Sequence, residues 1–169
     1  MECELILPCY NEAKNLPQLV DRCLEVVRNR KVEVGRFKLV LVNNGSTDNS
    51  AEVLNKLLAD DNVKKFVRVV QIDVNQGYGL GVFCGLKSCT ASILGWSHAD
   101  QQCDPDDFFR AVEILKSTDR PKKLLLIKGV RKGRFIKEVL ISRVFDLLAS
   151  ILLRFGIYEI NAQPKVFRR

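Results

Sequence analysis

The segment Val42-Asn43-Asn44-Gly45-Ser46-Thr47-Asp48 follows an apolar run, and so does the segment Trp96-Ser97-His98-Ala99-Asp100-Gln101-Gln102. Each run is typical of a buried strand, and each gives way to groups that can bind a polar ligand. In open α/β sheets, ligands bind outside the carboxyl ends of the strands. Amide side chains can read a nucleobase edge, and a carboxylate can hold a divalent cation against a diphosphate. The two segments therefore predict a nucleotide site and a metal site that face one cleft.

Apolar runs and helix-like patterns alternate along the chain. The strand-like runs are Cys3–Leu7, Phe37–Val42, Phe66–Ile72, Ile93–Ser97 and Leu124–Lys128. Apolar residues recur at helical spacing in Leu16–Asn29, Ser50–Ala59, Gly79–Ser88 and Asp106–Lys116. This alternation predicts an α/β fold in which a mostly parallel sheet has helices on both faces.

The composition is that of an ordinary globular protein with an uneven charge. The chain has 169 residues, 47% hydrophobic and 28% charged, so we expect one domain that spans residues 1–169. It has no signal-peptide pattern and no apolar stretch of bilayer length, which favours a cytoplasmic protein whose 6 cysteines are reduced. Residues 116–169 carry 14 Lys and Arg against 4 Asp and Glu, a net charge of +10. This basic third favours a phosphate-bearing partner or an anionic membrane, although a solvated basic face is the simpler interpretation.

A long helical pattern rich in Ile, Leu, Val and Phe occupies residues 135–156. Charged residues interrupt it at Lys137, Glu138, Arg143, Asp146 and Arg154. We expect a core helix, because a helix this apolar normally packs on another element. The alternative is an amphipathic helix that lies on a membrane surface.

Three further segments follow predicted strands. Pro8-Cys9-Tyr10-Asn11-Glu12 combines turn-forming residues with a carboxylate. Asn75-Gln76-Gly77-Tyr78-Gly79-Leu80-Gly81 has glycines that let the backbone approach a ligand. Gly129-Val130-Arg131-Lys132-Gly133-Arg134 has basic side chains that can hold phosphate. Each segment taken alone is explained equally well as an ordinary loop, so their order along the chain is the informative feature.

In that order the segments resemble the family 2 glycosyltransferases. The order is Pro-x-Tyr-Asn-Glu, Asn-Asn-Gly-Ser-Thr-Asp, Asn-x-Gly-x-Gly, x-Ala-Asp and Gly-x-Arg, and the likeness extends over essentially the whole chain. It is closest to the branch that includes the dolichyl-phosphate mannose synthases and their bacterial relatives. The resemblance implies a GT-A fold, a UDP- or GDP-sugar donor and Mg²⁺ or Mn²⁺ as cofactor. It also implies inverting transfer to a polyprenyl phosphate or a saccharide, with peripheral membrane contact and no nucleic-acid partner.

The resemblance assigns roles to individual residues. The residues matched to nucleotide binding are Pro8, Tyr10, Glu12, Asn44 and Gly77. Asp100 is matched to catalysis through metal and diphosphate binding, and Arg131 and Arg134 to phosphate or acceptor binding. Glu159 matches a position that is usually Asp in relatives, and it is the candidate catalytic base for a hydroxyl acceptor. A phosphate acceptor needs no base, because its oxygen is already anionic near neutral pH.

The sequence departs from the family pattern in two ways. His98 replaces the first acid of the family's Asp-x-Asp motif, and a neutral imidazole suits Mg²⁺ poorly. His98 is therefore interpreted equally as a metal ligand or as a structural residue, since Asp100 and the donor diphosphate can hold the cation without it. Family members usually continue past Arg169, so we expect a chain truncated at its C-terminus. Both departures leave open an inactive nucleotide-sugar-binding module.

Two rival classes are weaker. A Rossmann-type oxidoreductase is disfavoured because Gly79-x-Gly81 lacks the third glycine, at Cys84, of a dinucleotide fingerprint. The basic C-terminal third alone would suit a nucleic-acid or membrane-surface protein, which predicts salt-sensitive binding and no affinity for nucleotide sugars.

Overall fold

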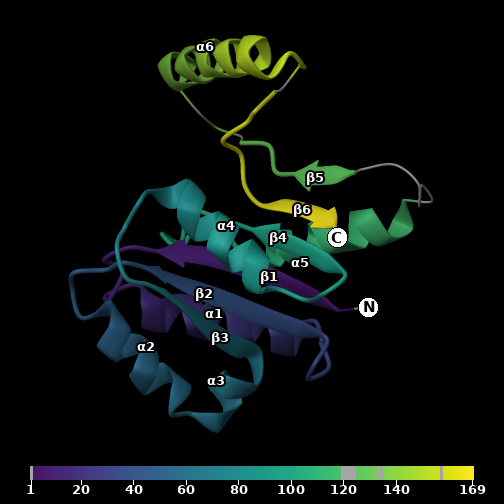
Figure 1. Cartoon of the computed structure of the whole chain (residues 1–169). Coiled ribbons are helices and arrows are strands. Elements are labelled where there is room, and N and C mark those ends of the chain that lie inside the picture. The colour runs from purple at the N-terminus through teal and green to yellow at the C-terminus, as the bar shows by residue number, and fades with distance from the viewer. Residues whose placement is uncertain (1, 119–124, 132, 134, 157) are drawn as a thin grey trace.

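The computed structural model describes residues 2–118, 125–131, 133, 135–156 and 158–169 (Figure 1). Arg134 and the first residue of the predicted run Leu124–Lys128 lie outside the described residues. The strands are β1 (Cys3–Cys9), β2 (Phe37–Asn44), β3 (Val67–Ile72), β4 (Ile93–Trp96), β5 (Leu126–Lys128) and β6 (Lys165–Arg168). The helices are α1 (Leu16–Asn29), α2 (Ser50–Leu58), α3 (Asp61–Phe66), α4 (Tyr78–Ser88), α5 (Pro105–Ser117) and α6 (Ile136–Leu153).

The described strands form one sheet in the order β3-β2-β1-β4-β6-β5. Strands β3, β2, β1 and β4 are parallel, whereas β6 pairs antiparallel with both β4 and β5. The predicted mostly parallel α/β sheet is confirmed. Strand β6 and the short helix α3 were not predicted. Strand β6 has just two apolar residues, Val166 and Phe167, so it gives no apolar run in the sequence.

Helices cover both faces of the sheet, as predicted (Figure 1). Side chains alternate along a strand, so Leu5 and Leu7 of β1 pack with residues of α1 and α5, while Ile6 faces the opposite side. Helix α4 crosses that opposite side closely. A Cβ added to Gly85 would lie 2.3 Å from Ile6 Cγ2, so the missing side chain sets the approach of α4 to the sheet.

The register of the central strands brings the polar segments together. Cys9 of β1 is paired with Asn43 of β2, and Ile6 of β1 is paired with Trp96 of β4. Because all three strands are parallel, their carboxyl ends lie at one edge of the sheet. The segments that follow β1, β2 and β4 therefore meet at this edge, as the sequence predicted.

Helix α6 stands apart from the sheet (Figure 1). Its large apolar side chains are exposed, with Ile141 and Leu152 exposed by 70% and 81%. The expectation of a core helix is therefore wrong: the polar side of α6 contacts the rest of the domain, and the apolar side points away. Among the described residues, no helix combines the length and hydropathy that crossing a bilayer requires.

Candidate functional site

The loops that follow β1 and β2 are joined by hydrogen bonds from side chains to backbone. Asn11 adopts a left-handed conformation with φ of 56°, and its Oδ1 accepts from the backbone N–H groups of Thr47 at 2.8 Å and Asp48 at 3.2 Å. Asp48 Oδ2 in turn accepts from the N–H of Ala13 at 3.2 Å, and Ser50 Oγ accepts from the N–H of Glu12 at 3.1 Å. The two predicted motifs thus form one rigid wall of the site.

Asp48 is ionised more readily than an ordinary aspartate. Burial opposes ionisation, but hydrogen bonds from Ser50 and Ala13 outweigh it and hold the pKa of the Asp48 carboxyl below its ordinary value. Asn11 and Asp48 were not predicted as site residues, because an Asn in a turn and an Asp before a helix have ordinary local roles. Their signal is the pairing of two loops, which a single sequence does not display.

The residues of the first motif have different environments. Pro8 is buried within β1, and a Cβ added to Gly81 of α4 would lie 3.0 Å from Pro8 Cβ. The Glu12 carboxylate accepts from the Asn15 side-chain amide at 2.6 Å. The Tyr10 side chain is exposed, at 46%. Tyr10 can therefore contact a ligand directly, whereas Pro8 and Glu12 shape the loop around it.

Asn44 and Gly77, two predicted nucleotide-binding residues, contact each other. Asn44 is 3% exposed, and its Nδ2 donates to the Gly77 carbonyl oxygen at 3.1 Å. Its Oδ1 is also buried and, among the described residues, has no hydrogen-bond donor. Gly77 has φ of 95°, a conformation open mainly to glycine. Asn44 therefore holds the turn before α4 in place and keeps one acceptor free.

The segment that follows β4 contacts the start of α4. The His98 ring packs on the Tyr78 ring with centroids 5.0 Å apart, and the Tyr78 hydroxyl donates to the Ser97 carbonyl oxygen at 3.3 Å. Burial raises the pKa of the Tyr78 phenol. Through Gly77 and Tyr78, the ends of β2 and β4 are connected. Asn44 and Asp100 thus lie at the same edge of the sheet, as the sequence predicted.

Asp100 is exposed beyond this contact. Its Oδ1 accepts from the Gln102 N–H at 3.1 Å. Among the described residues, no three His, Cys, Asp or Glu side chains are grouped closely enough to hold a metal ion. A cation here would have a single protein carboxylate as ligand, and its other ligands would be oxygens of a bound molecule and of water. Mg²⁺ is commonly coordinated in this way, and oxygen ligands also suit Mn²⁺. The ring contact of His98 with Tyr78 favours its structural role.

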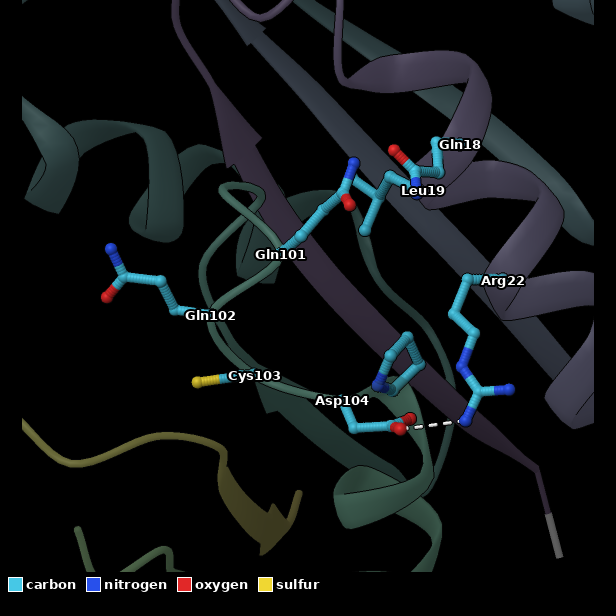
Figure 2. A pocket seen from close by; sticks show the side chains of 8 residues that line it. Gln18, Leu19, Arg22, Gln101, Gln102, Cys103 and Asp104 are labelled. Carbon is cyan, nitrogen blue, oxygen red and sulfur yellow. Dashed lines mark hydrogen bonds and ion pairs between the residues drawn. The ribbon is translucent and has the colours of Figure 1, made fainter. Parts of the chain in front are cut away.

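A cleft of about 360 Å³ lies between α1 and the loop before α5 (Figure 2). Gln18 and Arg22 from α1 face Gln101 and Asp104 from the loop, and Arg22 Nη2 pairs with Asp104 Oδ2 at 2.7 Å. Burial opposes ionisation of Asp104, but a backbone hydrogen bond and Arg22 lower its pKa. None of the residues predicted to bind nucleotide or metal lines this cleft. The cleft is lined by the loop that follows Asp100, and it is not the predicted site.

A basic cluster lies beside β6, and we define it as Lys128, Arg131 and Lys165. Arg131 Nε pairs with Glu159 Oε2 at 2.9 Å, and the Glu159 side chain is 4% exposed. Lys128 contacts the Tyr158 carbonyl oxygen. Lys165 lies over the Trp96 ring, with Nζ 5.5 Å from its centroid. Lys128 of β5 is paired with Lys165 of β6. Burial, and then the charges of Lys128 and Arg131, lower the pKa of Lys165.

The basic cluster borders the edge that holds Asp100. A side-chain amide atom of Gln163 lies 3.5 Å from the Tyr78 hydroxyl oxygen. The structure therefore brings two separately predicted residues, Arg131 and Glu159, into one ion pair near the ligand edge. Lys128 and Lys165 were missed, since neither belongs to a recognisable motif. Arg134 lies outside the described residues, and its predicted role stays a prediction.

Comparison of the sequence with known proteins finds sugar transferases. The sequence model of glycosyl transferase family 2 matches residues 4–121. An undecaprenyl-phosphate 4-deoxy-4-formamido-L-arabinose transferase of Pseudomonas fluorescens is 31% identical over 111 residues, 64% of this chain and 30% of the relative. The transferase of the same name from Pectobacterium carotovorum is 30% identical over 110 residues, 64% of this chain and 32% of the relative. The matched part of the chain spans about a third of the length of these curated relatives.

Solved structures share the fold. A mannosyltransferase from Pyrobaculum calidifontis in complex with GDP-Man and Mn²⁺ has a TM-score of 0.64 at 18% identity, over 99% of this chain and 44% of that one. Glucosyl-3-phosphoglycerate synthase from Mycobacterium tuberculosis, in complex with Mn²⁺, UDP-glucose and phosphoglyceric acid, has a TM-score of 0.68 at 17% identity, over 99% and 56%. The fold is GT-A, as the resemblance implied. The family match ends before Arg131 and Glu159. With 118 residues inside it, the chain belongs to glycosyl transferase family 2.

Proposed function

We propose that this domain transfers a sugar from a UDP- or GDP-sugar to a polyprenyl phosphate, with inversion at the anomeric carbon. The observation that carries the proposal is the meeting of three sets of groups at one edge of the sheet. Tyr10 and Asn44 supply nucleoside contacts, Asp100 supplies an exposed carboxylate, and the basic cluster supplies positive charge. A diphosphate donor and a phosphate acceptor together require this combination.

Asn44 lies at the base of the proposed donor site. Its Oδ1 is buried and, among the described residues, accepts no hydrogen bond, which costs about 1–3 kcal/mol. A nucleoside N–H or O–H would recover this cost once a small shift of the Asn44 side chain or of α4 opens Oδ1 to the ligand. Tyr10 offers an exposed ring for the base, and no atom lies within 4 Å of a Cβ added to Gly77. Pro8 and Glu12 support this surface through the loop that they shape.

The divalent cation fits at Asp100. The solved mannosyltransferase and glucosyl-3-phosphoglycerate synthase are both complexes with Mn²⁺. In this chain, Asp100 would hold Mg²⁺ or Mn²⁺ together with donor diphosphate oxygens and water. When bound, the cation offsets the negative charge that grows on the leaving diphosphate. His98, engaged with Tyr78, would keep the Asp100 segment against α4.

A phosphate acceptor suits the site better than a saccharide hydroxyl. A hydroxyl needs a general base within hydrogen-bond reach, and the candidate base Glu159 is buried and paired with Arg131. A phosphate oxygen is already anionic and attacks the anomeric carbon itself. A new C–O bond forms as the bond to the nucleoside diphosphate breaks, so no proton has to move. The curated relatives, named as undecaprenyl-phosphate transferases, favour the same acceptor class and favour catalysis over an inactive module.

Helix α6 supports an acceptor that is held at a membrane. The exposed apolar side of α6 is suited to lie at the boundary of headgroups and acyl chains. The polar side of the same helix contacts Arg131, because Arg131 Nη2 donates to Ser142 Oγ at 3.2 Å. Peripheral binding through α6 would place a lipid phosphate close to the basic cluster.

The test is a thermal-shift panel of UDP- and GDP-sugars with and without Mn²⁺, followed by transfer to farnesyl phosphate. We expect metal-dependent stabilisation by one class of donor, lost in Asp100→Ala and kept in the control Asp21→Ala, an exposed carboxylate on α1. Wild-type donor affinity in Asp100→Ala would remove the metal role from that residue. Donor binding without any transfer would select the inactive module instead.

A further inference from the structure

Asp146 is a buried carboxylate on an exposed helix. It is 6% exposed, whereas its neighbours Phe145 and Leu147 are 49% and 61% exposed. Asp146 Oδ2 accepts from the Glu159 N–H at 2.7 Å, and Oδ1 accepts from the Ile160 N–H at 3.0 Å. Hydrogen bonds to an ionised acceptor are roughly twice as strong as neutral ones. Asp146 therefore fastens the turn at residues 159–160 to α6.

The polar side of α6 is built for this contact. Ser142, Asp146 and Ser150 follow at four-residue spacing, so they lie on one side of the helix. Ser142 Oγ accepts from Arg131, and Asp146 holds the turn beside it. The helix thus meets the domain through hydrogen bonds, and the loop that carries Arg131 is part of the same contact.

The turn at residues 159–160 positions the guanidinium of Arg131. Glu159 has φ of 53°, an unfavourable conformation for a residue with a Cβ, so its neighbours must hold it there. Its backbone N–H is bound to Asp146, and its carboxylate is bound to Arg131 Nε at 2.9 Å. Glu159 therefore links Asp146 to the Arg131 guanidinium, through its backbone N–H on one side and its carboxylate on the other.

We propose that Asp146 is a positioning residue for the acceptor phosphate, acting on Arg131 through Glu159. Asp146 need not touch the acceptor. It couples the place of α6, and hence its contact with a membrane, to the orientation of the phosphate-binding guanidinium. The proposal rests on the proposed function, in which Arg131 binds the phosphate of a polyprenyl acceptor.

The test is a double-mutant cycle read by binding of farnesyl phosphate to the intact chain, with farnesol as the uncharged reference. Asp146→Asn keeps the shape but turns an amide donor toward a backbone donor. We expect it to weaken farnesyl phosphate binding about tenfold and to leave farnesol binding unchanged. Arg131→Gln is expected to cause a similar loss. The double variant should bind no more weakly than Arg131→Gln alone, because both changes remove the same interaction. Asp21→Asn is the matched control.

Amide hydrogen exchange tests, without any ligand, whether Asp146 holds the turn at residues 159–160. Asp146→Asn should accelerate exchange at the Glu159 and Ile160 amides and leave α1 unchanged. If that variant does not fold, Asp146→Glu, which keeps the charge and shifts the oxygens, is put through the same cycle and should give a smaller loss.

The outcomes separate this proposal from the proposed function. The positioning role would be overturned if the losses of affinity in the two single variants multiply in the double variant, or if Asp146→Asn binds farnesyl phosphate like the wild type. Either result would leave the proposed transferase function intact. A wild-type chain that prefers farnesyl phosphate no more than farnesol would overturn the acceptor class, and the positioning role with it. Donor binding, measured separately, reports on the transferase alone.

Discussion

Replacement of Gly45 by alanine should damage the fold and the ligand edge together. Gly45 lies in the turn after β2 with φ of +68°, in the left-handed region. A Cβ at this position would lie 2.3 Å from the backbone nitrogen of Asn75 and 2.7 Å from the carbonyl carbon of Val74. Both contacts are with backbone, so no side-chain rotation can relieve them. The segment before Gly77 would have to move.

The magnitude follows from two contributions. The left-handed conformation costs about 1–2 kcal/mol for a residue with a Cβ. Overpacking against backbone adds about 1–3 kcal/mol, which brings the total to about 2–5 kcal/mol. Two other glycines separate these contributions. Gly77 has φ of +95° but nothing within 4 Å of an added Cβ, so Gly77→Ala should cost about 1–3 kcal/mol from conformation alone. Gly79 has neither problem and lies in α4, where alanine should stabilise by up to about 1 kcal/mol.

Urea unfolding followed by circular dichroism gives the three free energies, and thermal melting gives a second reading. At mid-range, Gly45→Ala should lower the melting temperature by about 10 °C. It should also weaken donor binding, because the displaced segment carries the Gly77 carbonyl that binds Asn44. The reasoning is refuted if Gly45→Ala is as stable as Gly79→Ala. If Gly45→Ala costs no more than about 1–2 kcal/mol, conformation alone accounts for the loss and the backbone clash does not exist.

Three further outcomes follow from buried and exposed groups. The Arg30 guanidinium lowers the pKa of Asp106, so the stability that this pair contributes is present above the ordinary carboxyl pKa and is lost as pH falls through the lower folded value. Asp106→Asn should therefore cost about 1 kcal/mol at pH 7 in urea titrations, and an equal cost at pH 2 would contradict the assignment. Burial raises the pKa of Cys23 to about 12, so iodoacetamide at pH 8 should label the less buried Cys84 first, as mass spectrometry can determine. Leu152→Ser should reduce sedimentation with anionic vesicles and leave the melting temperature unchanged, since Leu152 is exposed; a large loss of stability would show that α6 packs on the domain.

The parallel part of the fold could be read from the sequence because its signals are local. The strands β1 to β4 have seven, eight, six and four residues, each is built around an apolar core segment, and helices of suitable length separate them. Strand β6 has no such signal, since its two apolar residues, Val166 and Phe167, are flanked by Lys165 and Arg168. Its place between β4 and β5 depends on pairing across the sheet. Helix α6 shows the opposite failure, because its apolar pattern is clear but does not say which side faces the domain.

The sequence predicted which strand ends would meet at one edge, but it did not predict the contacts between them. Strand ends at one edge follow from parallel topology, so the convergence of Asn44 and Asp100 could be anticipated. Asn44 is buried and bound to Gly77 because α4 approaches the sheet closely. The pattern of apolar residues in the sequence does not reveal this approach. The pair between Arg131 and Glu159 joins residues 28 apart across a turn and a helix. That separation carries no periodic signal.

The charge of α6 discriminates between the two surfaces that could cover its apolar side. A second copy of the helix would bring Lys137, Arg143 and Arg154 toward the same residues of its partner, whereas an anionic bilayer attracts each of them by about 1 kcal/mol. Of the two acids on α6, the buried Asp146 faces the turn and accepts from its backbone, whereas the exposed Glu138 accepts from the Phe135 N–H and offsets one of the three cations. Charge therefore favours a membrane, and the contact should weaken steeply with salt.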